Sequence, residues 1–429
     1  MRLFPETPPP GPFRRGFWRS PLRGPWLTSI LGSILLVAIT VTALTGFVSH
    51  AAYQPDLGDN ALIPPGEDLP LTTPGWFTGP TWLYALNQGL HVNAGLVAIP
   101  LLLAKLWSVI PRLFAWPPVV SPAQALERLS ITLLVSSAVF ELATGVADIL
   151  YFYAFPFSFV TAHYYGGVIF VASLALHVAV KARVIRRAYR ERGVLRPLRD
   201  DLAHTRPEPG DPHGGLVPTE PAEPTISRRG LLAFVGAGSA ALLVANVGQS
   251  IGGPLRRLAF LAPRRDAPGS GPNAFPVNKT AKLAGITRDL VSEAYRLTVR
   301  GPGGERILSR DDLLALPQRT ERLTIGCVEG WSTTQTWTGV TLPELARMVG
   351  ATGARQVYVE SLQARGGFRE VTLGRDQLTD ERSLLALKVN GADLSLDHGF
   401  PARIIVPTLP GVHNTKWVRL VDFSEDRPA

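Results

Sequence analysis

The sequence predicts a multidomain protein, with an α-helical transmembrane bundle of four helices plus a fifth anchor helix, followed by an α+β domain. Five apolar stretches have about the 20-residue length that a helix needs to cross a bilayer. From residue 270 the chain instead alternates short β-rich runs with short helical patterns, which is typical of an α+β domain. The composition agrees, because 46% hydrophobic and 18% charged residues suit a chain partly in lipid and partly in water.

The apolar stretches set the domain boundaries. They lie at 26–48, 84–107, 129–150, 159–180 and 230–253. Residues 205–226 are rich in Pro, Gly and Glu and almost lack apolar residues, which predicts disorder. We therefore expect a cytoplasmic basic tail at 1–25, a four-helix membrane domain at 26–185, a disordered cytoplasmic linker at 186–226, a signal or anchor helix at 227–253 and a soluble domain at 270–429.

Charges in the connecting segments predict the orientation of the bundle. The loops at 50–83 and 148–158 contain no Lys or Arg, and the first of them carries Asp56, Asp59, Glu67 and Asp68. Basic residues cluster in the tail, between the second and third stretches, and after the fourth. Because basic loops stay in the cytoplasm, both ends of the four-helix bundle should lie inside and the two acidic loops outside. This placement of the +9 net charge beside membrane spans also argues against a nucleic-acid partner.

The start of the fifth stretch carries two consecutive arginines. Ser227-Arg228-Arg229-Gly230 precedes a soft apolar run and resembles a twin-arginine export signal placed inside the chain. The alternative is an ordinary fifth span whose arginines mark the inner side. Both interpretations place the soluble domain outside the cytoplasm, although Arg256, Arg257, Arg264 and Arg265 after the span favour the opposite side.

Histidines in the apolar stretches are candidate haem ligands. His91 and His163 begin the second and fourth stretches, share a depth near the outer face, and could bind one iron from opposite sides. Small residues one turn away would leave room for a porphyrin: Gly95, Gly166 and Gly167. The alternative is two histidines hydrogen-bonded to Tyr or Thr, with the glycines serving helix packing.

Residues 15–190 resemble the four-helix cytochrome b subunits of bacteria. That family commonly carries two bis-histidine haems, with paired histidines 14 apart on the last helix. His163 and His177 have this spacing, but no histidine lies at the depth of His177 to pair with it. The resemblance therefore implies one haem b at most, and His50 is expected to lie at the interface without binding iron.

The soluble domain contains the only cysteine, Cys327, so no intramolecular disulfide can form. A lone cysteine is usually a small buried hydrophobe. Here it follows an expected strand at 322–325 and enters a loop of small and aromatic residues, where a thiolate could face a cavity and bind a soft metal. Other strands are expected at 295–299, 357–360 and 404–406, and helices at 309–316 and 342–349, the second capped by Thr341 with Glu344 in the capping-box position.

Several motifs recur in order through this domain. They are Asn273-Ala-Phe-Pro-Val-Asn278, Cys327-Val-Glu-Gly-Trp331, Trp337-Thr-Gly-Val340, Leu385-Ala386 with Asn390-Gly391, His398-Gly-Phe-Pro-Ala-Arg403 and Pro410-Gly-Val-His-Asn-Thr-Lys-Trp417. Together they resemble the sulfite oxidase-type molybdopterin domain, and within it the branch of the periplasmic methionine-sulfoxide reductase catalytic subunit. The resemblance covers residues 273–425.

The resemblance implies roles for individual residues. Cys327 would be the thiolate ligand of molybdenum, and Arg403 would offer a planar fork to a phosphate or an anionic substrate. Lys416 would hold the pterin together with the backbone amides of Asn414 and Thr415. Pterin contacts are also implied for Asn273, Asn278 and His398, with stabilisation of a turn beside Gly399 as the alternative role of His398. Trp331 and Trp337 would wall the cavity.

These observations predict a membrane-anchored molybdenum oxidoreductase that moves an oxygen atom to or from a small sulfur compound, by sulfoxide reduction or sulfite oxidation. The attached bundle would exchange electrons with the quinone pool or a redox partner, with haem b as one route. Two alternatives remain open at this stage. The soluble domain could bind molybdopterin or another ligand without turnover, or the bundle could serve only as an anchor.

Overall fold

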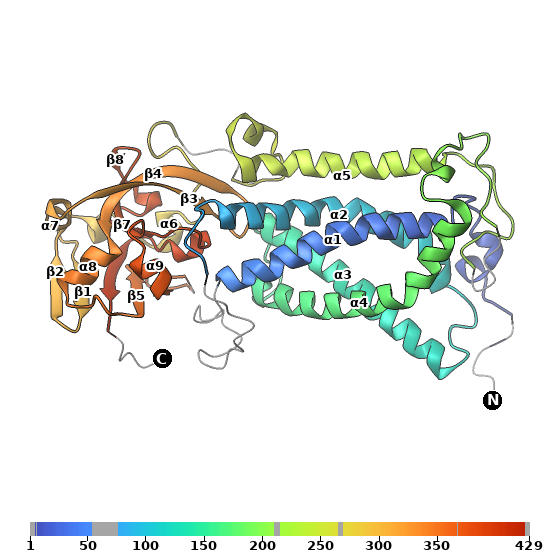
Figure 1. The fold of residues 1–429 in the computed structure, drawn as a ribbon, viewed down its shortest axis with the longest axis horizontal. Coiled ribbons are helices and arrows are strands. Elements are labelled where there is room, and N and C mark those ends of the chain that lie inside the picture. Colours follow the sequence, from blue (N-terminus) through green and yellow to red (C-terminus); the bar gives the residue numbers. More distant parts are fainter. Residues whose placement is uncertain are drawn as a thin grey trace. The chain divides into compact units, whose positions relative to one another are not determined.

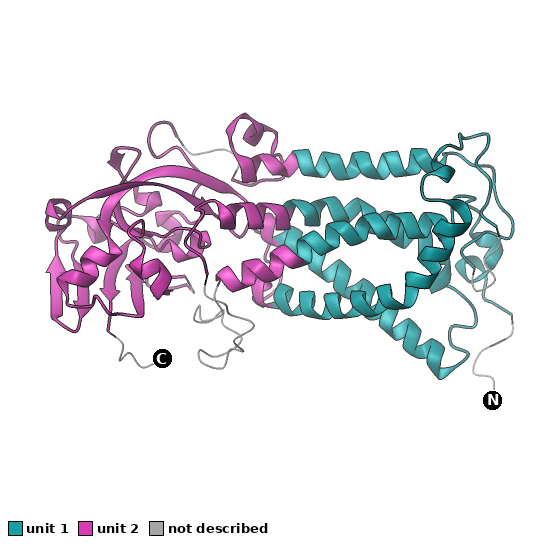
Figure 2. Cartoon of the chain, in the orientation of Figure 1, with its two compact units in different colours: residues 1–43, 93–147, 162–244 teal, residues 44–92, 148–161, 245–429 magenta. Residues whose placement is uncertain are grey.

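The structure, a computed structural model, describes residues 5, 7–53, 76–209, 215–264, 269–366 and 368–424. The chain divides into two compact units, which Figure 2 shows in different colours. The first comprises residues 1–43, 93–147 and 162–244, and the second comprises 44–92, 148–161 and 245–429. Both units therefore contain parts of the long helices. The acidic residues of the first loop, Asp56, Asp59, Glu67 and Asp68, and the basic residue Arg265 lie outside the described residues.

Five helices are long and apolar enough to cross a membrane, which confirms the predicted spans. They are α1 Pro25–Tyr53, α2 Leu83–Leu113, α3 Pro122–Ile149, α4 Phe159–Arg192 and α5 Arg228–Ile251 (Figure 1). The fourth helix continues into the stretch that we had assigned to the disordered linker from residue 186. No helix breaker interrupts this basic stretch, and the helix ends where Gly193 adopts a left-handed φ of +71°.

The helix parts within the first unit pack through small and aromatic side chains. One buried cluster is built around Trp26 and Leu31 of α1, against Trp107 of α2. A second cluster joins the first four helices: Ile39, Ala98, Ala138 and Phe170. Lys105 is an ionisable residue within α2, and its Nζ donates to the Thr28 carbonyl at 2.6 Å.

A buried carboxylate joins several segments of the first unit. Glu208 is 4% exposed and accepts hydrogen bonds from the N–H groups of Trp26 at 2.8 Å and Leu27 at 3.1 Å. These N–H groups begin α1 and have no partner within the helix. Arg228, the first residue of α5, is 1% exposed and lies 3.9 Å from the same carboxylate. The composition of 205–226 predicted disorder, whereas Glu208, inside this stretch, is buried and hydrogen-bonded.

The soluble domain lies wholly in the second unit and contains two five-stranded sheets. Their orders are β2-β1-β10-β5-β6 and β3-β4-β7-β8, with β9 also paired to β7. All pairs are antiparallel except β1 with β10. The strands are β1 Leu297–Gly301, β2 Gly304–Leu308, β3 Arg319–Gly326, β4 Ser332–Thr341, β5 Gln356–Ser361, β6 Glu370–Gly374, β7 Leu384–Val389, β8 Ala392–Asp393, β9 Arg403–Ile405 and β10 Val418–Asp422. The short helices are α6 Ala281–Ala284, α7 Arg310–Ala315, α8 Leu342–Met348 and α9 Arg375–Thr379.

The predicted strands correspond to β1, β3, β5 and β9, and the predicted helices to α7 and α8. Thr341 caps α8 by accepting from the Glu344 N–H at 3.1 Å, but Glu344 pairs with Arg347 rather than completing a capping box. The complete box is at the start of α7, where Ser309 and Asp312 cap each other.

Strands β3 and β4 form a hairpin that carries the lone cysteine. Gly326 pairs with Ser332 at its end, so residues 327–331 are the connection, here called the Cys327 loop. This agrees with the prediction that Cys327 follows a strand and enters a loop. The hairpin places the cysteine at one end of the second sheet, beside the segments that lead into β9 and β10.

Candidate functional site

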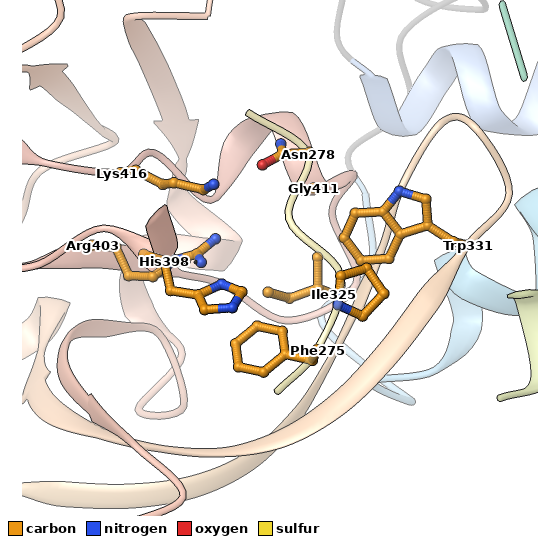
Figure 3. A pocket seen from close by; sticks show the side chains of 9 residues that line it. Phe275, Asn278, Ile325, Trp331, His398, Arg403, Gly411 and Lys416 are labelled. Carbon is orange, nitrogen blue, oxygen red and sulfur yellow. Dashed lines mark hydrogen bonds between the residues drawn. The ribbon is translucent and has the colours of Figure 1, made fainter. Parts of the chain in front are cut away.

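The second unit contains a small pocket beside the Cys327 loop. It is lined by Phe275, Pro276, Asn278, Ile325, Trp331, His398, Arg403, Gly411 and Lys416. Figure 3 shows the side chains of Arg403, His398 and Lys416 projecting from one side, with Trp331 opposite. Two of the nine lining residues are cationic and none of these nine is acidic. The pocket therefore suits an anionic ligand.

Arg403 begins β9 and is held rigidly, since it is 3% exposed. Its Nη1 donates to the His398 carbonyl at 3.0 Å, its Nη2 donates to the Asn414 carbonyl at 3.2 Å, and its guanidinium lies 5.2 Å from the Trp337 ring centre. The buried Nε has no partner within the described part of the chain. Burial lowers the pKa of Arg403 to about 9, because no counter-charge compensates the lost solvation.

Lys416 lies beside Arg403 and is 7% exposed. Its Nζ donates to the carbonyls of Lys279 at 2.9 Å and Asp397 at 2.8 Å. Burial, and then the neighbouring Arg403, lower the pKa of Lys416 well below its ordinary value. A bound anion would stabilise the charged forms of both side chains, so the pair is arranged for a ligand that carries negative charge.

Gly399 allows the two cations to lie this close together. Its φ is +108°, in the left-handed region that favours glycine. A Cβ at this position would come 3.0 Å from the Cβ of Arg403 and 3.2 Å from that of Lys416. The His-Gly motif noted in the sequence therefore has a steric cause.

His398 closes the pocket beside the cations. Its Nε2 lies 3.0 Å from the Asn273 carbonyl, and its ring stacks on Phe275 with 3.7 Å between ring centres. Burial, Arg403 and Lys416 lower the pKa of His398 to about 3, so the imidazole is neutral at physiological pH. A neutral Nε2–H then donates to the carbonyl, which holds the ring in place as a wall of the pocket.

Cys327 is 2% exposed and belongs to a buried cluster with Leu323 and Trp337. Gly411, which lines the pocket, lies against it, since a Cβ on Gly411 would come 3.9 Å from the Cys327 Cα. Burial raises the pKa of the thiol to about 11, and the nearby Arg264 charge acts in the opposite direction. A metal binds the thiolate form and therefore displaces this proton.

A polar group that the sequence did not identify surrounds the Cys327 loop. Glu329 is 8% exposed and accepts from the Trp331 Nε1 at 2.6 Å, and it also accepts from the Tyr151 hydroxyl. Arg264 lies 3.4 Å from the Glu329 carboxylate, with its guanidinium 4.1 Å from the Tyr151 ring centre. Burial raises the pKa of Glu329 to about 8. Arg264 had been considered only as an orientation signal, because nothing in its sequence context indicates this contact.

The site residues fit a molybdopterin. Buried polar atoms without a partner among the described residues include the Arg403 Nε, the Thr415 Oγ1 and the Trp337 Nε1. Such atoms are costly unless they bind a ligand or water. Of these three residues Arg403 lines the pocket, where a phosphate-bearing group would accept from its Nε, and the sulfur of Cys327 is a soft donor adjacent to the pocket. The donor set therefore agrees with a pterin-bound metal.

Two residues predicted to contact the pterin make local hydrogen bonds in the structure, and their pterin contacts stay predictions. The Asn273 side chain donates to the Asp393 carbonyl at 3.0 Å and accepts from the Ser395 N–H at 2.8 Å, so its amide fastens one loop to another. The Asn414 N–H, predicted to hold the pterin, donates instead to the Gly411 carbonyl at 3.2 Å. The Asn273 side-chain amide and the Asn414 N–H thus bond to nearby backbone groups, which a motif match cannot show.

One of the two predicted haem ligands, His163, has the hydrogen bond to a threonine that the alternative interpretation expected. In the first unit, His163 Nδ1 lies 2.9 Å from the Thr144 hydroxyl and 3.3 Å from the Glu141 carboxylate. The space beside Gly166, expected to accept a porphyrin, contains the side chains of Glu141 and Phe140. In the second unit, the ring of His91 fills the space beside Gly46 in the same way. Haem binding by His91 and His163 therefore stays a prediction from the sequence.

Comparison with known families agrees with the pocket chemistry. The oxidoreductase molybdopterin binding domain family matches residues 284–429. This part of the chain is a molybdopterin-binding oxidoreductase domain. The match confirms the predicted domain type and covers β1 to β10, the Cys327 loop and most of the pocket.

Curated relatives are similar over limited lengths. The chain is 31% identical to the sulfite oxidase of Gallus gallus over 162 residues, which is 31% of this chain and 35% of that protein. It is 33% identical to the uncharacterized oxidoreductase YuiH of Bacillus subtilis over 121 residues, which is 28% of this chain and 60% of that one. It is 28% identical over 142 residues to the putative protein-methionine-sulfoxide reductase subunit YedZ1 of Azospira oryzae, covering 33% and 53%. The chain thus spans about a third to three fifths of the length of these relatives.

Proposed function

We propose that this molybdopterin-binding oxidoreductase is anchored in a membrane and transfers an oxygen atom to or from a small sulfur compound. The observation that carries the proposal is the pair of buried cations, Arg403 and Lys416, facing a pocket beside the lone Cys327 of a molybdopterin-binding domain. Sulfite oxidase and the putative methionine-sulfoxide reductase subunit, both similar to this chain, act by name on sulfur compounds.

The residues of the pocket have distinct roles in this proposal. Cys327 would supply the thiolate that holds the metal. Arg403, Lys416 and the Thr415 hydroxyl would bind the anionic and polar edges of the pterin, with Asn278 and His398 lining its position. When bound, the cofactor supplies the two-electron oxygen-atom transfer, while the protein orients the substrate and excludes water.

The overall reaction balances in either direction. A sulfoxide takes up two electrons and two protons to give a thioether and water. Sulfite takes an oxygen atom from water to give sulfate, and releases two electrons and two protons. Both directions therefore need an electron carrier, and we infer that the membrane part exchanges electrons with the quinone pool or a redox partner. Haem b at His91 and His163 remains a prediction from the sequence. A b-type band in the reduced-minus-oxidised spectrum that is lost in His91→Ala would support it.

The arrangement of the second unit supports an extracytoplasmic catalytic domain. The soluble domain shares this unit with residues 44–92 and 148–161. These segments include the helix ends joined by the two loops that contain neither Lys nor Arg. Since basic loops remain inside, these ends are expected outside, and the soluble domain with them. Export of a folded, cofactor-loaded domain by the twin-arginine-like segment would also place the domain on the extracytoplasmic side.

The proposal is tested with the purified full chain, expressed with adequate molybdenum. Wild type should contain about one molybdenum per chain and should reduce or oxidise at least one compound in a screen of sulfoxides, N-oxides and sulfite with a dye as the electron donor or acceptor. Cys327→Ser should abolish this turnover while leaving membrane insertion unchanged. Intact wild type without molybdenum, or full turnover by Cys327→Ser, would refute the proposal. Molybdenum without turnover on the whole panel would favour a binding protein.

A further inference from the structure

The Cys327 loop has an internal geometry that fixes the cysteine. The Cys327 N–H donates to the Trp331 carbonyl at 2.8 Å, and the Gly330 N–H donates to the Cys327 carbonyl at 2.9 Å. Gly330 adopts a φ of +92°, which a residue with a side chain would adopt only under strain. These bonds use both backbone polar groups of Cys327. The remaining carbonyls of the loop, at residues 328–330, face other parts of the second unit.

The N-terminal end of α2 holds the first of these carbonyls. Gln88 Nε2 donates to the Val328 carbonyl at 2.5 Å, and the Gln88 Oε1 accepts from the Ser49 hydroxyl of α1 at 2.7 Å. The approach of α2 is close along the whole loop. A Cβ on Gly330 would come 3.0 Å from the Val92 side chain, and one on Gly326 would come 3.0 Å from the Ala85 Cα.

The C-terminal end of α5 holds the next two carbonyls. Gln249 Nε2 lies 3.4 Å from the Glu329 carbonyl, and the Ser250 hydroxyl donates to the Gly330 carbonyl at 2.7 Å. The residue after the loop makes the reverse contact, since the Ser332 hydroxyl donates to the Ser250 carbonyl at 2.6 Å. Three consecutive carbonyls of the Cys327 loop therefore accept hydrogen bonds from side chains of two apolar, membrane-length helices.

We propose that Gln88, Gln249 and Ser250 are positioning residues for the metal thiolate, so that the ends of α2 and α5 form part of the catalytic site. Backbone carbonyls buried at these positions need donors, and these side chains supply them. Because the bonds lie within three residues of Cys327, they fix the loop that carries its sulfur beside the pocket. The ends of these helices would then contribute to the geometry of the site in addition to anchoring the domain. This inference rests on the proposed role of Cys327 as the metal ligand.

The test compares two serines of the same helix. Ser250→Ala removes the hydroxyl that binds the Gly330 carbonyl. Ser239→Ala removes a hydroxyl of α5 that donates to the Val97 carbonyl at 2.9 Å and is distant in sequence from the loop contact. The two substitutions are chemically identical, and each removes one hydroxyl-to-carbonyl hydrogen bond from α5. Gln88→Met, which keeps the side-chain length and removes the amide, is a second variant at the loop.

Hydrogen exchange of the full-length chain in detergent gives the first readout. Ser250→Ala and Gln88→Met should speed exchange of the Cys327 and Gly330 amides by about fivefold, which corresponds to about 1 kcal/mol at 1.4 kcal/mol per tenfold change. Ser239→Ala should leave these amides as in wild type. This measurement needs no cofactor, so it stands even if the proposed function fails.

The second readout is the electron paramagnetic resonance spectrum of the loaded protein after its molybdenum has been reduced by one electron with dithionite to the paramagnetic Mo(V) state. A change in the direction of the sulfur alters the spectrum, whereas a loss of stability elsewhere does not. We expect altered spectra for Ser250→Ala and Gln88→Met and an unchanged spectrum for Ser239→Ala. Wild-type exchange at the loop, or wild-type spectra, in both loop variants would overturn the inference. An equal effect of Ser239→Ala would overturn it as well.

Discussion

Arg403→Met tests the anionic pocket most directly. The guanidinium uses Nη1 and Nη2 on two backbone carbonyls, at 3.0 and 3.2 Å, and leaves the buried Nε without a partner in the described residues. One charge-assisted hydrogen bond contributes about 1.5–3 kcal/mol. Losing the Nε bond to a pterin phosphate should therefore weaken cofactor binding by about 10- to 140-fold. Arg403→Lys keeps the positive charge but not the planar guanidinium, so it should weaken cofactor binding less than Arg403→Met does.

The matched control is Arg310→Met. Arg310 also lies over an aromatic ring, 5.0 Å from the centre of Phe400, and its Nε is also a buried atom without a partner among the described residues. It pairs with Asp393 at 2.6 Å and does not line the pocket. Both variants lose similar local packing, whereas only Arg403→Met should lose affinity for the cofactor.

The assay measures molybdenum by mass spectrometry and released pterin by fluorescence, in protein purified at equal yield. The rate at which the cofactor is lost after dilution gives the affinity change independently of loading in the cell. Arg403→Met should lose its cofactor faster than Arg310→Met by the factor given above. A folded Arg403→Met protein with wild-type content and a wild-type release rate would refute the assignment of this arginine to the cofactor.

Three further predictions concern stability, each read from the thermal or denaturant midpoint in detergent. Gly339→Ala should destabilise the protein by about 3 kcal/mol, because a Cβ at this position in β4 would come 2.6 Å from the Ala386 Cα of β7. The control Gly353→Ala has open space around it and should change stability by less than about 0.5 kcal/mol. Equal midpoints for the two variants would contradict this steric argument. Burial lowers the pKa of His413 to about 4 from 6.5, so the unfolded state binds the proton first as the pH falls. Stability should therefore be lost below pH 6.5, by about 2 kcal/mol at pH 5, and His413→Gln should flatten this dependence. Glu208→Ala should cost about 3–5 kcal/mol by leaving Arg228 buried without its carboxylate, and a change below about 1 kcal/mol would show that the contact is weak.

Periodic and local signals were enough to predict the coarse fold. The apolar stretches have a length that only membrane helices require, so all five were found. Thr341 and Ser309 each precede an apolar helical pattern. Thr341 caps α8 and Ser309 caps α7, each by accepting a hydrogen bond from a backbone N–H of the first turn. Strand β4 was missed because its sequence, Ser-Thr-Thr-Gln-Thr-Trp-Thr-Gly-Val-Thr, is polar on both faces for half its length. Its position is fixed by pairing with β3 and β7, which no local window contains.

In the candidate site, too, residues in local motifs were predictable, whereas contacts between distant segments were not. Cys327, Arg403, Lys416 and His398 stand in motifs, and the structure brings the last three together around one pocket with Cys327 adjacent. Contacts made by lone polar residues were not predictable. Ser250 is one serine in an apolar helix, and its partner is 80 residues away in the sequence. Such contacts depend on how segments meet in space, and a single sequence carries no signal for them.

The order of strands in the first sheet has a consequence for biosynthesis. β10, Val418–Asp422, follows the other described strands in the sequence, yet it lies between β1 and β5 and pairs with both. The two halves of this sheet therefore cannot join until residues 418–422 have been synthesised. Pairing between segments this far apart in the sequence is slow, so we expect the first sheet to form late in folding.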